Sequence, residues 1–310
     1  MLQRSCRLIL GLCLLLSGAV LAQAATVVVV SSERSAAYVE AAEALTNQLE
    51  KGGLARQQVQ VIPAAEWSGA SNLKPGLFVA LGAQAAELLA RSELPAPLLC
   101  TLLPRASFER TLAATGRKAG AQLSAVFLDQ PVLRQLNLIR LAMPAAQRVG
   151  VLWGPESIAA APALRSLARS RQLELVEAKV GSDEALFPAL RQVLQQSDLL
   201  LAVPDSAIYN SSNIQNILLA SVRAKVPLLA FSPAYARAGA ALSLYVTPTQ
   251  LGVQAGRLAH GVLQGKELAA APLYAQDFEL LVNQPVARAL GLKLDATALR
   301  EQLRRDEGAP

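Results

Sequence analysis

The chain has 310 residues, of which 53% are hydrophobic and 17% are charged, so it is longer than one usual domain and too apolar for a disordered or fibrous protein. Its single histidine excludes a metal centre built from several imidazoles. The formal net charge of +6 includes Arg4 and Arg7, and the densest basic run, 300–305, contains no aromatic residue, so nucleic acid is not an expected partner.

The first 24 residues have the pattern of a secretory signal peptide. Arg4 and Arg7 precede an apolar stretch over 8–21, and an Ala-Gln-Ala cleavage site follows at 22–24. Because the apolar stretch is shorter than the roughly 20 residues that span a bilayer, we predict cleavage rather than anchoring. The mature protein is therefore expected to be soluble and periplasmic.

Removal of this segment would leave Cys100 as the remaining cysteine. One cysteine cannot form an intramolecular disulfide, so stability in an oxidising compartment must come from the hydrophobic core. Cys100 lies within the apolar run 97–103, which favours a buried, unreactive thiol over a nucleophile.

After the signal peptide, short apolar runs alternate with longer amphipathic stretches, which is typical of parallel sheets covered by helices. The predicted strands fall into two sets, 27–30, 59–62, 77–81, 98–102 and 123–128, then 149–153, 173–180, 199–203, 227–231 and 241–246. Helices are predicted over 35–50, 131–143 and 157–171, and after Ser182 and Ser211 or Ser212. The fold class is therefore α/β, with two Rossmann-like lobes.

The two sets of strands define the expected domains. The first lobe should contain 25–128 and about 247–294, and the second lobe 129–246. A helix over 250–264, a strand over 278–283 and a helix over 285–290 are expected to return and cover the first lobe, which leaves a cleft between the lobes. The charged tail, 295–310, is expected to fray.

Motifs for catalysis do not occur in this sequence. It contains no phosphate-binding Gly-x-x-x-x-Gly-Lys loop, no dinucleotide-binding Gly-x-Gly-x-x-Gly and no Gly-x-Ser-x-Gly nucleophile elbow. A Ser-His-Asp triad would need His260, which the helical spacing places on the polar face with Arg257 and Gln264. We therefore expect a protein that is not an enzyme and that uses no cofactor and no metal.

A binding role follows from the topology. In open α/β sheets, ligands bind beyond the carboxyl ends of the strands, where helix N-termini and loop amides converge. The candidate ligand-binding residues are those that follow the predicted strands: Ser31, Ser32, Ser35, Gly82, Gln84, Asp129, Gly154, Glu156, Ser157, Asp205, Ser206, Tyr209, Ser232, Tyr235 and Tyr245, with Thr247 close behind. Each of them also fits a simple role as a helix cap or turn residue.

Three of these candidates suggest specific chemistry. Asp205, which follows Pro204 at a strand end, is placed to meet a cation of the ligand. Tyr209 or Tyr235 is placed to lie over an apolar or aromatic group of the ligand, although packing at the lobe edge explains both tyrosines equally well.

Several segments carry a family resemblance. They are 148–157 (RVGVLWGPES), 199–205 (LLLAVPD), 224–231 (AKVPLLAF), and the stretch from 250–252 (QLG) through 278–283 (FELLVN) to 289–292 (ALGL). With these segments the chain resembles the ABC-transporter substrate-binding proteins of the periplasmic binding protein type I class, in the branch often assigned to aromatic or branched amino acids. The resemblance covers about 120–294 and, more loosely, the first lobe.

The chain departs from this family's pattern at two strand ends. Similar proteins commonly have Gly-Thr-Pro-Ala where this chain has Gly-Ala-Gln-Ala at 82–85, and they tend to have an acidic residue where this chain has Ser232 and Pro233. A hydroxyl and a carboxylate are thus missing from the expected cleft. The resemblance then implies a site that has changed its ligand or lost it.

Two functions remain open after these observations. The leading hypothesis is a monomeric periplasmic protein whose lobes close on a small polar or amino-acid-like ligand and deliver it to an ABC permease. The alternative is a sensory or partner-binding protein on the same scaffold, which signals to a membrane receptor or kinase. An enzyme on this fold is disfavoured because the sequence offers no activated nucleophile or base.

Overall fold

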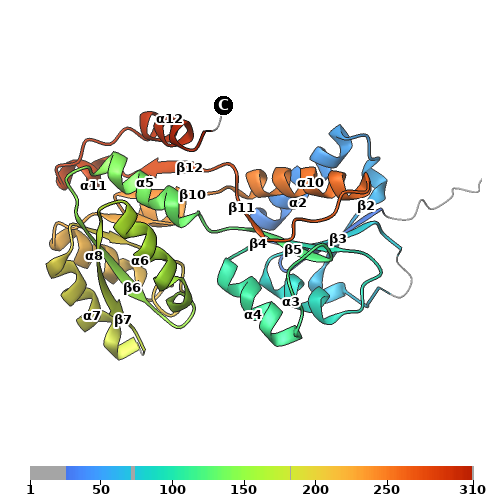
Figure 1. Cartoon of the computed structure of the whole chain (residues 1–310), viewed down its shortest axis with the longest axis horizontal. Coiled ribbons are helices and arrows are strands. Elements are labelled where there is room, and N and C mark those ends of the chain that lie inside the picture. The colour runs from blue at the N-terminus through green and yellow to red at the C-terminus, as the bar shows by residue number, and fades with distance from the viewer. Residues whose placement is uncertain (1–25, 71–73, 182, 309–310) are drawn as a thin grey trace, which may run out of the picture.

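The computed structural model describes residues 26–70, 74–181 and 183–308. The predicted signal peptide and the predicted helix cap Ser182 lie outside these residues. Among the helices in the described ranges, none combines the length and apolar character needed to cross a lipid bilayer. Two bodies lie side by side in Figure 1, each built around its own sheet.

The first lobe is built on a sheet of parallel strands with the order β11-β5-β4-β3-β1-β2. Its strands are β1 (Val27–Ser31), β2 (Val59–Pro63), β3 (Leu77–Leu81), β4 (Leu98–Leu103), β5 (Leu123–Phe127) and β11 (Leu273–Tyr274). Its helices are α2 (Ala36–Lys51), α3 (Ala83–Arg91), α4 (Arg105–Thr115) and α10 (Pro248–Leu263).

The second lobe repeats this plan with the order β12-β10-β9-β8-β6-β7. Its strands are β6 (Arg148–Trp153), β7 (Glu174–Lys179), β8 (Leu199–Leu201), β9 (Leu228–Ala230), β10 (Leu242–Tyr245) and β12 (Glu279–Val282). Its helices are α5 (Val132–Ala142), α6 (Ala161–Ser170), α7 (Asp183–Gln196), α8 (Ile214–Arg223), α9 (Pro233–Ala238), α11 (Gln284–Ala289) and α12 (Ala296–Asp306). Strand β12 runs antiparallel to β10, whereas the other pairs in this sheet are parallel.

The apolar runs form strands because helices cover both faces of each sheet. In β1, Val27 and Val29 pack against α2 and α10, whereas Val28 and Val30 pack against α3 and α4. All four valines are fully buried, so a continuous apolar run is the pattern that this strand needs. Each predicted strand is present, and the predicted α/β fold with two Rossmann-like lobes is confirmed.

The chain passes between the two lobes three times, and these crossovers orient the sheets. Residues 128–131 lead from the carboxyl end of β5 to α5, and residues 246–247 lead from the carboxyl end of β10 to α10. Because both crossovers are short, the carboxyl ends of the parallel strands in the two sheets face one another (Figure 1). The third crossover, 275–278, joins β11 to β12. We call the loops at these two carboxyl edges the facing edges.

The C-terminal part of the chain corrects the predicted domain boundaries. Strand β12 belongs to the second sheet, and α11 and α12 contribute Ala287 and Leu303 to the core of the second lobe. The prediction that 278–290 covers the first lobe was wrong, because β12 finds its partner in β10. In the tail that was expected to fray, residues 296–306 form α12, and Asp295 caps this helix by accepting hydrogen bonds from the amides of Thr297 and Ala298.

Candidate functional site

Asp205 anchors the loops that follow β6 and β8. Its side chain is 3% exposed, and one carboxylate oxygen accepts hydrogen bonds from the amides of Glu156 and Ser157 at 3.0 and 2.9 Å and from the Ser157 hydroxyl at 2.8 Å. The other oxygen accepts a bond from the Ala207 amide at 3.1 Å. A Cβ at Gly154 would collide with this carboxylate, so the glycine allows the close approach. Asp205 therefore anchors these two loops, and its predicted contact with a ligand cation stays a prediction.

Glu156 lies on the surface of this loop and connects the two lobes. One of its carboxylate oxygens accepts a hydrogen bond from the Ser206 amide at 3.0 Å, and the other pairs with the Arg110 guanidinium of α4 at 2.8 Å. Burial alone would raise the pKa of Glu156, but the Ser206 amide and the positive charge of Arg110 outweigh it and lower the pKa. A charged Glu156 thus joins the second lobe to the first.

Aromatic side chains gather at the ends of β8 and β9. Phe231 contacts Tyr209 and Tyr235 edge to face, with ring centroids 5.8 and 5.2 Å apart. Tyr235 is half-buried and donates its hydroxyl to the Tyr209 carbonyl at 3.0 Å. Tyr209 itself is buried, its hydroxyl has no partner among the described residues, and burial raises its pKa. Phe231 and Tyr235 are therefore the solvent-accessible members of this cluster, and the buried Tyr209 packs against Phe231.

In the first lobe, Ser32 joins the end of β3 to the start of α3. The Ser32 hydroxyl donates to the Leu81 carbonyl at 2.8 Å and accepts from the Ala85 amide at 2.9 Å. Gly82 lies between them with φ +88°, and a Cβ there would approach the Ser32 hydroxyl to 2.6 Å and the Tyr38 ring to 2.7 Å. Glycine is needed here both for its backbone conformation and for this close approach.

Asp129 follows β5 at the first crossover. It is half-buried, and its carboxylate accepts a hydrogen bond from the Arg105 amide, the first residue of α4, at 2.6 Å. Burial raises the pKa of Asp129, and the Arg105 amide opposes that effect only in part. Asp129 thus lies where the carboxyl edge of the first sheet meets the second lobe.

The remaining predicted residues take local roles at the facing edges. Three of them serve turns and helix starts: Ser31 donates to the Glu33 carbonyl, Ser232 caps α9, and Thr247 caps α10. Ser35 precedes α2 but makes no capping hydrogen bond with its side chain. Gln84 and Ser206 are exposed, and Tyr245, the last residue of β10, is half-buried. The predicted set thus divides between the two facing edges, and Glu156 is the member with a direct ion pair to the opposite lobe.

Two residues of the facing edges were not predicted. Phe231 was assigned to the preceding strand, although the end of that apolar run could have revealed it as the residue after β9. Arg110 lies in the middle of α4 rather than at a strand end, so no sequence pattern marks it. Both residues belong with the candidate site because of their contacts with Tyr235 and Glu156.

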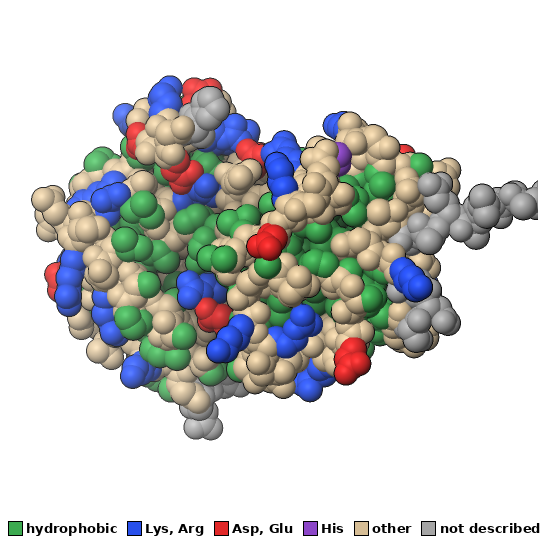
Figure 2. Space-filling model, turned by 45° about the vertical axis from the view of Figure 1, so that its right-hand side comes forward, with side chains coloured by type: hydrophobic (Ala, Val, Ile, Leu, Met, Phe, Trp, Pro, Cys, Tyr) green, Lys and Arg blue, Asp and Glu red, His purple; other side chains and the backbone are tan. Residues whose placement is uncertain are grey.

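Two observations on the described residues concern metal binding and thiol chemistry. No group of three or more His, Cys, Asp or Glu side chains among them is arranged to hold a metal ion. Cys100 is fully buried in β4, and burial raises its thiol pKa to about 12, as expected for an unreactive cysteine. On the face shown in Figure 2, basic and acidic side chains are intermixed rather than gathered in one basic patch.

Comparison with known proteins agrees with this architecture. A family described as "ABC transporter substrate binding protein" matches residues 71–303. A protein named "Tyrosine-binding protein" from Clostridioides difficile is 23% identical over 241 residues, which cover 76% of this chain and 69% of that protein.

Two solved structures are similar to the whole of the described fold. One is a domain from Streptococcus pneumonia in complex with L-Trp, with a TM-score of 0.63 and 18% identity, covering 90% of this chain and 98% of that one. The other is the ligand-free, open structure of a substrate-binding protein with adhesive properties from Clostridium difficile, with a TM-score of 0.69 and 18% identity, covering 87% and 96%. At these identities the likeness establishes the type I periplasmic binding protein fold.

Proposed function

The chain belongs to the ABC transporter substrate-binding protein family. We propose that it works outside the cytoplasmic membrane, where it captures a small amino-acid-like ligand between its lobes and delivers it to an ABC permease in that membrane. The observation that carries the proposal is the orientation of the two sheets, in which the carboxyl ends of the parallel strands face one another across short crossovers. Loop amides and helix N-termini converge at such edges, and a ligand held there contacts both lobes at once.

We propose an aromatic amino acid or its analogue as the ligand. The half-buried pair of Phe231 and Tyr235 offers ring edges and faces at the end of β9. One relative is named a tyrosine-binding protein, and one similar structure holds L-Trp, which supports the same class. Aromatic rings pack best against other rings in offset or edge-to-face arrangements, so this cluster is suited to hold the side chain of such a ligand.

The polar end of the ligand is assigned to the first lobe. The N-terminus of α3 follows Gly82, and its first amides lack partners within the helix, which suits a carboxylate. Asp129 is the acidic candidate for an ammonium group, because Asp205 is buried and accepts hydrogen bonds from two loops, and Glu156 is paired with Arg110. Because the pKa of Asp129 is raised, we expect its contact with the ammonium group to be sensitive to pH.

A thermal-shift and calorimetric screen tests the proposal on the chain without residues 1–25. The panel contains L-tyrosine, L-tryptophan, L-leucine and 3-(4-hydroxyphenyl)propionate, which lacks the ammonium group. A ligand at about 100 times its Kd stabilises the fold by roughly 2.7 kcal/mol, so binding raises the melting temperature measurably. Stabilisation by the aromatic compounds supports the proposal. The absence of any shift across the panel would favour the sensory or partner-binding alternative.

Delivery to a permease needs a separate test. The loaded protein should stimulate ATP hydrolysis by its ABC permease reconstituted in vesicles, and the ligand-free protein should do so less. If the loaded and the ligand-free protein stimulated ATP hydrolysis equally, delivery to the permease would be contradicted, but ligand capture would not.

A further inference from the structure

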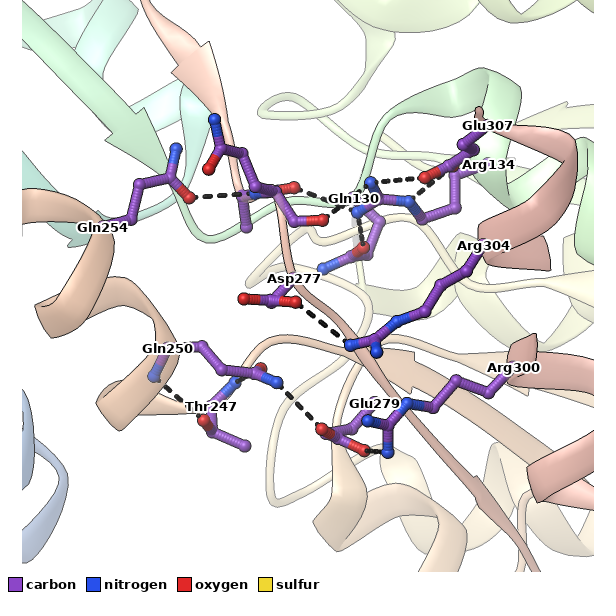
Figure 3. A network of polar contacts seen from close by, with 12 residues as sticks. Gln130, Arg134, Thr247, Gln250, Gln254, Asp277, Glu279, Arg300, Arg304 and Glu307 are labelled. Atoms are coloured by element: carbon purple, nitrogen blue, oxygen red, sulfur yellow. Dashed lines mark hydrogen bonds and ion pairs between the residues drawn. The ribbon is translucent and has the colours of Figure 1, made fainter. Parts of the chain in front are cut away.

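The C-terminal helix α12 and Glu307, the residue that caps its C-terminal end, make three ion pairs along one face. Arg300 pairs with Glu279 at 2.6 Å, Arg304 pairs with Asp277 at 3.0 Å, and Glu307 pairs with Arg134 at 2.7 Å. Spacings of four and three residues place these α12 side chains on the same side of a helix. Figure 3 shows all three pointing toward the third crossover and the start of α5.

Arg134 is the buried centre of this network. Its side chain is 6% exposed, and all five of its N–H groups donate hydrogen bonds. Two bonds reach the Glu307 carboxylate, and the others reach the Gln130 side chain and the carbonyls of Ala275 and Gln276. A single guanidinium thereby ties the first crossover and the third crossover to α12 (Figure 3).

Helix α10 of the first lobe holds the third crossover from the opposite side. The Gln254 side chain accepts a hydrogen bond from the Gln276 amide at 2.9 Å and donates to the Tyr274 carbonyl at 3.1 Å. The Gln250 side chain donates to Glu279 at 2.8 Å, and Glu279 is the same carboxylate that binds Arg300. The segment 274–279 is therefore bonded to a helix of each lobe.

One buried group in this network is not satisfied in the present arrangement. The Gln130 side chain uses its oxygen to accept from Arg134, but its amide nitrogen has no hydrogen-bond partner among the described residues. A buried donor without a partner raises the free energy of the arrangement that leaves it so. A different angle between the lobes would move the first crossover and change the surroundings of this donor.

We propose that α12 is a clamp on the hinge between the lobes, in which Arg134 is a positioning residue that sets the balance between lobe arrangements and hence the affinity of the site. This inference rests on the proposed binding function. A ligand that contacts both lobes binds one arrangement better than the others, so its apparent affinity depends on the fraction of protein already in that arrangement. Residues far from the ligand then control its binding through the hinge.

Glu307→Gln and Arg304→Gln test the clamp, and Glu301→Gln is the matched control. Glu307→Gln removes the negative charge beside the buried guanidinium of Arg134. Arg304→Gln breaks a more exposed ion pair on the same face, so this second variant still tests the clamp if Glu307→Gln folds poorly. Glu301 is an exposed glutamate of the same helix and forms no ion pair among the described residues.

The distance between the lobes is measured in the ligand-free protein by spin labels. Cysteines introduced at Ala113 of α4 and Ser166 of α6 are exposed, and the buried Cys100 does not compete for the label. The same variants are titrated with L-tyrosine. We expect both clamp variants to broaden or shift the distance distribution and to change the Kd by about fivefold or more, which is the lower range of typical coupling between sites. The control should leave both measurements unchanged.

A clamp variant that lowers the melting temperature but keeps the distance distribution of the unchanged protein overturns the proposal, because α12 then only stabilises the second lobe. A changed distribution with an unchanged Kd overturns the link to affinity. The distance measurement needs no ligand, so failure of every amino acid to bind would refute the proposed function without deciding the hinge test.

Discussion

Arg110 and Glu156 form an ion pair of 2.8 Å between helix α4 of the first lobe and the loop after β6 in the second lobe. Their side chains are 57% and 27% exposed, so water screens the attraction. The pair therefore adds little to stability, but its geometry depends directly on the separation of the facing edges.

Glu156→Gln should lower the free energy of unfolding by less than about 1 kcal/mol at pH 7, as is usual for partly exposed pairs. The folded pKa of Glu156 is lowered, so its contribution is present above the unfolded pKa of a glutamate and is lost as the pH falls through the lower folded value. The difference between the two proteins should then vanish in acid. Urea unfolding at pH 7 and pH 3 measures it.

Glu87→Gln is the control for this prediction, because it breaks the exposed pair with Arg91 inside α3 and leaves the facing edges untouched. A stability difference for Glu156→Gln that persists at pH 3 would mean that the loss is one of packing rather than of charge.

Asp205→Asn should destabilise the fold by about 2 kcal/mol, since an amide nitrogen would then face one or more of the N–H and O–H donors around the carboxylate. Denaturant unfolding gives the value. Asp306→Asn, at an exposed carboxylate of α12, should change it by less than about 0.5 kcal/mol. Equal effects at the two positions would argue against the anchoring role of Asp205.

The strands were predictable because a strand covered on both faces must be apolar at every position. The run at β1 is buried along its whole length, and β3 and β5 repeat this pattern. Each of these apolar runs lies within one strand, so the strand can be recognised without knowledge of the strand that it pairs with. Strand β12 shows the limit, since nothing within 279–282 reveals that it will pair antiparallel with β10 instead of returning to the first sheet.

The site was harder to predict because contacts distant in sequence decide which polar groups are available. Asp205 follows a strand, as a ligand-binding carboxylate would, but Glu156 and Ser157 from another loop use it as an acceptor. The charged residues of the C-terminal tail led to a wrong prediction for the same reason, because their partners are distant in sequence. Arg304 and Glu307 suggested a frayed end, yet they find partners at the hinge.

Gly82→Ala should destabilise the protein more than Gly116→Ala does. Gly116 has the left-handed angles φ +67° and ψ 7°, which an alanine adopts at modest cost, whereas Gly82 has φ +88° and ψ 170°, a conformation that only glycine adopts readily. Only at Gly82 does the new methyl group meet side chains, namely those of Ser32 and Tyr38. We expect an extra loss of about 1 kcal/mol or more in unfolding free energy, within the range for overpacked sites. Equal losses would contradict both the special backbone conformation at Gly82 and the close approach of Ser32 and Tyr38.

Cys100 should resist alkylation in the folded protein. Its thiol is fully buried and its pKa is raised to about 12, so the reactive thiolate is absent at neutral pH. In the chain without residues 1–25, iodoacetamide followed by intact mass measurement should find no adduct under native conditions and one adduct in urea. Rapid native labelling would place Cys100 at an accessible surface and contradict the packing of β4.

Phe231→Leu should weaken binding of L-tyrosine by about three- to tenfold, because an aromatic pair contributes roughly 0.5–1.5 kcal/mol beyond the area it buries. Leucine keeps the site apolar but removes the ring that contacts Tyr209 and Tyr235. The control is Phe187→Leu, at an exposed phenylalanine of α7 outside the facing edges, which should leave the Kd unchanged.

L-Leucine, titrated into the same two variants, separates an effect on the ring from a general loss of the site. If Phe231 contacts the aromatic group of the ligand, the variant loses affinity for L-tyrosine but not for L-leucine. Equal losses for both amino acids would mean that Phe231 shapes the loop after β9, as its contacts with Tyr209 and Tyr235 also allow. An unchanged affinity for L-tyrosine would move the ligand away from this cluster and leave Asp129 and the N-terminus of α3 as the remaining contacts to test.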